Sequence, residues 1–163
     1  MANQDAAFGL RANSKLGSNV NSEGTTEYSI ASGASGNIFS GDPVKMANTG
    51  TILVAAAGDQ LLGVFRGCRY TNSSGEVIYS AYWPDGTVSS DAVAFVVDDP
   101  NALFEVQSAA TGSVVQTVVG NNADIDDDGD GYHDQTEIRM ETDPFDPSNY
   151  PFSGGRVGLA VLS

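Results

Sequence analysis

The sequence predicts an all-β protein, a small β-barrel or sandwich of about ten short strands, and three observations lead to that prediction. Short apolar runs rich in β-branched and aromatic residues recur every 8–12 residues or so. Turn signals separate them, and the chain contains 19 glycines and 6 prolines. Only one short segment, residues 136–141, has a helical pattern. A chain of 163 residues is the size of a single domain.

The first 25 residues are polar and poor in β-branched side chains, and they predict an extended N-terminal arm. Phe8, Leu10 and Leu16 are the large apolar groups of this segment. If the arm lies across a neighbouring subunit, Phe8 and Leu10 are its expected apolar anchors and Arg11 its expected charged contact. A disordered tail that only aids solubility is the alternative.

A β-domain is expected over residues 26–121 and 149–163. Turn signals such as Asn48-Thr49-Gly50 and Pro84-Asp85-Gly86 set the ends of its strands. The final apolar run is expected to return to the sheet, which makes residues 122–148 an insertion between two strands. The expected strands, in chain order, cover residues 28–31, 37–40, 44–47, 51–56, 60–65, 77–83, 92–97, 103–107, 113–119 and 156–162.

The insertion holds ten of the 21 acidic residues and one of the seven basic residues. Nine of the fourteen net negative charges therefore lie within residues 122–148. Acidic groups at that density repel one another unless a cation lies among them. The charge of this segment is thus expected to reflect metal binding. An acidic, solvated loop with accidental spacing is the alternative.

The spacing inside the insertion matches a calcium loop of the EF-hand type. Gly131 stands at the sixth position, where such a loop turns sharply. The last ligand is expected to be bidentate, and Mg²⁺ is expected to fit poorly because it requires a tighter octahedron. The predicted Ca²⁺ ligands are the side chains of Asp126, Asp128, Asp130, Asp134 and Glu137 together with the backbone carbonyl of Tyr132.

The flanks of this loop differ from those of an EF-hand pair. A β-branched run, residues 113–119, precedes it where an entering helix is usual, and no second loop follows. The acidic loop and the following Thr142-Asp143-Pro144 resemble thrombospondin type-3 and dockerin-like calcium repeats over about residues 124–148. That resemblance implies a structural ion. It leaves Asp143 either a further ligand or a turn residue before Pro144.

Composition argues against several classes of function. The basic residues are scattered, so direct nucleic-acid binding is not expected. No signal peptide or membrane span is recognisable, which predicts a soluble protein made in a cytoplasm. Cys68 is expected to be a small core residue.

The only histidine, His133, lies inside the metal loop, so a histidine-based catalytic site elsewhere is impossible and we expect no enzyme. The adjacent Asp98 and Asp99 are expected to be turn residues.

The β region carries a second resemblance. Its residues are Gly41-Asp42-Pro43-Val44, then Gly50-Thr51-Ile52, then the run from Ala57 to Gly67. This pattern, over residues 1–107, resembles head decoration (cement) proteins of tailed bacteriophages. The resemblance implies a virion protein on the outer capsid surface. Its partners would be the major capsid protein and neighbouring copies of itself, as a homotrimer. The calcium segment is not part of that pattern.

An alternative function of another class stays open at this point. A calcium-stabilised β-domain is also compatible with a cell-surface or glycan adhesion module. Aromatic residues beside the loop, Tyr132, Tyr150 and Phe152, would favour this alternative if they are exposed.

Overall fold

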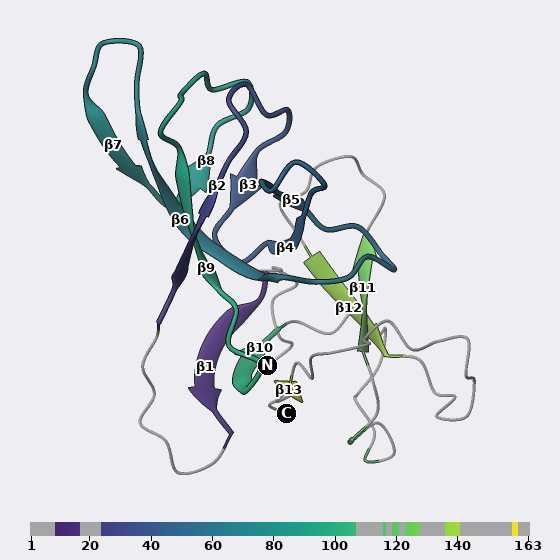
Figure 1. Cartoon of the computed structure of the whole chain (residues 1–163). Helices are drawn as coiled ribbons and strands as arrows, with labels where there is room; N and C mark the ends of the chain where they lie inside the picture. The colour runs from purple at the N-terminus through teal and green to yellow at the C-terminus, as the bar shows by residue number, and fades with distance from the viewer. Residues whose placement is uncertain are drawn as a thin grey trace, which may run out of the picture.

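The computed structural model describes residues 9–16, 24–106, 116 and 119–120, together with the backbone of three further strands in residues 123–159. All regular elements among these residues are strands, which confirms the predicted all-β class (Figure 1). The strands are β1 Arg11–Lys15, β2 Thr26–Ser29, β3 Ile38–Phe39, β4 Pro43–Met46, β5 Ile52–Val54, β6 Gly63–Thr71, β7 Val77–Ser80, β8 Tyr82–Trp83, β9 Val93–Val97, β10 Ala102–Glu105, β11 Ala123–Asp127, β12 Thr136–Met140 and β13 Gly158–Leu159.

The largest sheet has six strands in the order β2-β9-β6-β4-β5, with β7 paired to β6 beside this path. All of its strand pairs are antiparallel. A second sheet has three strands in the order β1-β10-β13, and β3-β8 and β11-β12 form two-stranded pairs. The described sheets have open edges, so these strands do not form a closed barrel.

Glycine-containing turns join neighbouring strands where the sequence predicts them. Between β4 and β5, the Gly50 amide donates to the Ala47 carbonyl at 3.0 Å, and Gly50 has a φ of +79°. Between β6 and β7, the Asn72 side-chain oxygen accepts from the amides of Ser74 and Glu76, each at 2.9 Å. An asparagine that bonds its own following backbone fixes a tight turn, so both hairpins have local causes.

The main apolar core lies on one face of the six-stranded sheet. Trp83, Phe65, Val44 and Ile52 are fully buried there, and Tyr70 packs edge-on against Trp83 with ring centroids 5.3 Å apart. Offset and edge-to-face aromatic pairs are the favourable geometries for such rings. A smaller cluster consists of five buried residues from β1, β6, β9, β10 and their flanks: Leu10, Val64, Val97, Ala102 and Phe104.

Part of the predicted arm belongs to the folded domain. Arg11–Lys15 forms β1, which pairs antiparallel with β10, and Leu10 is 4% exposed within the smaller cluster. The expectation that Leu10 anchors a neighbouring subunit is therefore wrong, because its side chain is already buried in its own chain. Composition did not reveal β1, since a strand of sequence Arg-Ala-Asn-Ser-Lys has no apolar periodicity. Residues 1–8 and 17–23 lie outside the described residues.

The expected helix at residues 136–141 is also wrong. Thr136–Met140 is strand β12, paired along its length with β11. Cross-strand hydrogen bonds satisfy the backbone of this short segment, whereas an isolated helix of six residues or so is marginal in water. The final apolar run contains β13, which pairs in parallel with β10. Most of the expected strand at 113–119 lies outside the described residues.

Candidate functional site

The β11-β12 hairpin brings together the two ends of the predicted calcium loop. The register sets Asp126 directly opposite Glu137, with Ile125 opposite Ile138 on one side and Asp127 opposite Thr136 on the other. Directly opposed residues of an antiparallel pair have Cα atoms about 4.5–5.5 Å apart. The first and twelfth positions of the loop are thus neighbours, and a closed loop of this kind is what ligands to one ion require.

The remaining predicted ligands, Asp128, Asp130, Tyr132 and Asp134, lie outside the described residues, as does Asp143. Asp126 and Glu137 are described by their backbone alone. Elsewhere, within residues 9–16 and 24–106, no group of three or more His, Cys, Asp or Glu side chains could hold a metal ion. The register thus places the backbone of the two ends of the predicted loop opposite each other, and the calcium site stays a prediction.

The neighbouring carboxylates Asp98 and Asp99 serve separate structural contacts. Asp98 accepts hydrogen bonds from the Thr26 hydroxyl at 2.9 Å and the Tyr28 hydroxyl at 2.7 Å. The bond to Asp98 is the main reason that the pKa of Tyr28 is raised. Asp99 forms an ion pair with Lys15 and accepts from the Asn101 amide, which together lower its pKa. Asp99 stabilises the turn after β9, in agreement with the role expected of it, whereas Asp98 links the residue after β9 to β2.

A third carboxylate fixes the base of the β6-β7 hairpin. Asp91 accepts from the Thr71 hydroxyl at 2.6 Å, the Thr71 amide at 3.0 Å and the Ser89 hydroxyl at 2.7 Å. These hydrogen bonds, first those from the Thr71 and Ser89 side chains, lower the pKa of Asp91 to about 2. Hydrogen bonds to a carboxylate stabilise its charged form, so this group is a structural anion.

Cys68 is a core residue, as the sequence predicts. It is 1% exposed within the main core, and its thiol donates to the Tyr82 carbonyl at 3.3 Å. Burial raises its pKa to about 11. The thiolate is the reactive form of cysteine, and this environment disfavours it.

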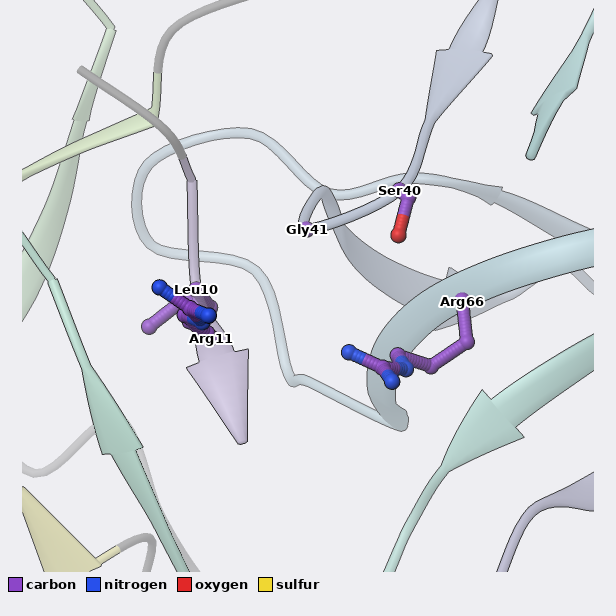
Figure 2. Close-up of a pocket in the computed structure, with 5 residues that line it drawn as sticks. All are labelled: Leu10, Arg11, Ser40, Gly41 and Arg66. Atoms are coloured by element: carbon purple, nitrogen blue, oxygen red, sulfur yellow. The ribbon is translucent and has the colours of Figure 1, made fainter. Parts of the chain in front are cut away.

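An open hollow of about 270 Å³ lies where β1, the β3-β4 turn and β6 meet, lined by Leu10, Arg11, Ser40, Gly41 and Arg66. Figure 2 shows Arg66 extending from β6 toward the β1 side of this hollow, where Arg11 lies, and the Ser40 hydroxyl near its edge. Sequence reasoning singled out Arg11 but missed Ser40 and Arg66, because only the tertiary fold brings these three segments together.

Comparison of the chain with protein-family models, with curated proteins and with solved structures finds no match. The described residues include no helix of the length and apolar character needed to cross a membrane.

Proposed function

We propose that this protein is a structural component of a bacteriophage virion that decorates and stabilises the outer surface of the capsid. Its partners would be the major capsid protein and further copies of itself, arranged as a trimer. A calcium ion bound by residues 126–137 would order the acidic insertion. The virion would be the site of action and the host cytoplasm the site of synthesis.

One observation carries this proposal: the segments of the decoration-protein resemblance form one contiguous part of the fold. Gly41-Asp42-Pro43-Val44 forms the turn into β4, Gly50-Thr51-Ile52 leads into β5, and the run from Ala57 to Gly67 enters β6. β4 pairs with both β5 and β6. The pattern therefore covers three strands that pair with one another and so describes one structural unit. Hairpin signals that matched by accident would not need to fall on strands that pair.

The calcium part of the proposal is supported by the loop spacing and by the register that sets Asp126 opposite Glu137. When bound, Ca²⁺ would neutralise the converging carboxylates and hold the loop closed. The main core lies within residues 30–96, so the β-domain has its own apolar core apart from this loop. Chelation is therefore expected to affect the insertion and to leave the β-domain folded.

Co-sedimentation with purified phage capsids that lack their decoration protein tests the capsid role. The full chain is expected to sediment with capsids at saturable stoichiometry. A variant lacking residues 2–8 spares Leu10 and β1, and it separates any contribution of the extreme N-terminus from the fold of the domain. Saturable binding to glycans or cell surfaces together with none to capsids would favour the adhesion alternative.

Calorimetric titration with Ca²⁺ tests the metal site. One ion per chain is expected to bind, with much weaker binding of Mg²⁺. Binding to the native state alone adds about 2.7 kcal/mol of stability at a hundredfold excess over Kd. The double variant Asp126→Ala and Asp130→Ala should lose this calcium-dependent increase and keep its β-type circular dichroism. Absence of binding at millimolar Ca²⁺ would remove the ion from the proposal.

A further inference from the structure

We propose that the outer edge of β7 pairs with the same edge of a second copy of this chain, which joins two six-stranded sheets into one. The two β7 strands would run antiparallel about a two-fold axis at Ile78. This contact stands on described residues alone. It is additional to the trimer proposed above, and it does not depend on the capsid role.

β7 is an edge strand. Among the described strands it pairs with β6 alone, and Figure 1 shows the β6-β7 hairpin extending away from the rest of the sheet. Edge strands present unpaired backbone groups, which proteins usually protect with charged side chains, prolines or bulges. Val77–Ser80 contains no charged residue and no proline, and its register with β6 is regular. The edge is therefore open to a further strand.

The closing hydrogen bond of the β6-β7 hairpin fixes which residues of β7 direct their backbone groups toward β6. The Asn72 amide donates to the Glu76 carbonyl at 2.9 Å, so these two residues form a hydrogen-bonded pair. Hydrogen-bonded and non-hydrogen-bonded pairs alternate along an antiparallel ladder. The even-numbered residues of β7 therefore bond to β6, and the N–H and C=O groups of Val77 and Tyr79 point outward.

Two further contacts agree with this alternation. The Ser80 carbonyl oxygen points toward β6, where it lies 2.8 Å from the Cβ position of Gly67. The amide of Thr71, the residue opposite Val77, donates to Asp91 at 3.0 Å. This amide is therefore not bonded to β7, as expected for a non-hydrogen-bonded pair. The backbone groups of Val77 are thus left for the outer side.

A two-fold axis at Ile78 matches the outward backbone groups of the two copies. It sets Val77 of each copy opposite Tyr79 of the other, so that both residues exchange their N–H and C=O groups across the axis. The other register with the same alternation is centred on Tyr79. It sets the apolar Ile78 opposite Ser80 and requires Ala81, which lies beyond the end of β7. The axis at Ile78 uses only residues that are already extended.

The side chains on the outer face suit the same register. Val77 is 54% exposed and Tyr79 is 72% exposed, whereas Ile78 packs against the main core. Aromatic and β-branched residues directly opposite each other are favourable cross-strand pairs. The axis at Ile78 forms two such pairs, each between Val77 of one copy and Tyr79 of the other. Pairing therefore covers two exposed apolar side chains of each copy.

The charge distribution favours a second copy at this edge. Residues 77–83 contain no charged side chain, although the chain carries a net charge of −14. No like charges meet within the paired strands, and the repulsion comes from the rest of the two chains. Salt screens this repulsion, so association should strengthen with ionic strength. A contact through one short strand buries less than the roughly 1,200 Å² of stable interfaces, so a weak association is expected.

Sedimentation equilibrium and amide hydrogen exchange of the full chain, each over a range of protein concentrations, test this contact. We expect reversible self-association that strengthens with sodium chloride. In the same range the Val77 and Tyr79 amides should become protected, whereas the Ile78 and Ser80 amides should be protected at every concentration. Self-association through another surface, the proposed trimer included, would leave exchange at Val77 and Tyr79 unchanged. That result, or a monomer at millimolar concentration, would overturn the proposal.

Two exposed residues provide a variant and its matched control. Tyr79→Lys places a charge on the open edge and should weaken association at least tenfold. Val88→Lys adds the same charge at a residue that is 76% exposed and lies outside β7, so it should leave association unchanged. Unchanged circular dichroism establishes that both variants are folded. Equal losses in the two variants, or none in Tyr79→Lys, would overturn the site.

A double variant tests the register. Val77→Glu together with Tyr79→Lys sets opposite charges across the axis at Ile78 and should recover association that Tyr79→Lys alone loses. Salt should now weaken the recovered association, the reverse of its effect on the unaltered chain. An axis at Tyr79 would set like charges opposite each other. Absence of recovery would therefore overturn the axis at Ile78.

Discussion

The six-stranded sheet and the three-stranded sheet bury their apolar residues in different ways. The six-stranded sheet covers the main core of eleven buried residues, and two of its strand pairs are hairpins with local turns. The three-stranded sheet shares a smaller cluster of five buried residues with β6 and β9 of the larger sheet, which supply Val64 and Val97. It joins β1, β10 and β13, which are far apart in the chain. The comparison shows that strands paired with a neighbour in the chain can be recognised from their own sequence pattern. In contrast, β1 forms because it pairs with the distant strand β10.

The largest expected effect on stability comes from removing one buried phenylalanine side chain from each of the two clusters. Phe65, in the main core, is 0% exposed, and Phe104, in the smaller cluster, is 3% exposed. Replacing either with Ala is expected to cost about 3–5 kcal/mol of unfolding free energy, with Phe65→Ala at the upper end. Urea unfolding measures these costs. Hydrogen exchange should show that Phe104→Ala exposes β1 and β10 and leaves β6 and β9 protected. Equal exposure of all four strands would mean that the two clusters unfold as one unit.

Gly9 tests the backbone junction that leads into β1. It has a φ of +71°, and a Cβ there would lie 2.9 Å from the Gly41 carbonyl oxygen. Gly33 has nearly the same φ, +72°, with no atom within 4 Å of its Cβ position. Gly33→Ala is expected to cost about 1–2 kcal/mol for the backbone conformation alone. Gly9→Ala should cost more in the same denaturation measurement. Equal costs would show that β1 adapts freely at this contact.

The Asp91 network of the larger sheet predicts a change in acid stability. The folded pKa is about 2, below the ordinary value of 3.8, so this carboxylate stabilises the fold above the ordinary value. That contribution is lost as the pH falls through the folded pKa. Asp91→Asn should therefore flatten the dependence of stability on pH between about 4 and 2. Thr71→Val removes the hydroxyl that donates to the same carboxylate and should produce a change in the same direction. An unaltered acid profile in both variants would contradict the network.

The smallest expected effects come from one ion pair in each region. Lys15 pairs with Asp99 beside the three-stranded sheet, and Lys45 pairs with Asp59 in the larger sheet at 2.5 Å. The side chains of the first pair are 18% and 26% exposed, against 31% and 30% for the second. Lys15→Met should thus lower the melting temperature slightly more than Lys45→Met. Salt should reduce both differences, since exposed pairs are screened. A larger loss for Lys45→Met would reverse the order given by burial.

Sequence patterns predicted much of the larger sheet. Apolar runs bounded by glycine turns located β4, β5, β7 and β9 to within a few residues, because their alternation and turn chemistry are local properties. The same reasoning underestimated β6, which continues to Thr71 beyond the expected end at residue 65. The bulge at Arg66 interrupts the regular alternation there, so the pattern ended before the strand did.

The acidic loop and the hollow also differ in how far the sequence predicts them. The twelve-residue spacing of Asp126–Glu137 is a property of the sequence, and the predicted ion follows from it before any fold is known. The β11-β12 pairing adds the register that sets the two ends of this loop opposite each other, and it replaces the expected helix with a strand. The hollow at Arg11 and Arg66 has no sequence signature, since its residues come from three separate segments.

By itself, the sequence determined the all-β class, most strands of the larger sheet, the core position of Cys68 and the spacing of the acidic loop. These properties depend on residues close together in the chain, where turn chemistry and side-chain alternation act directly. Only the tertiary structure decided that β1 is a strand, that Leu10 is buried and that Arg11 and Arg66 line the same hollow. Each of these depends on a partner contributed by a distant segment, such as β10 or the β3-β4 turn. Local propensity does not predict such a partner.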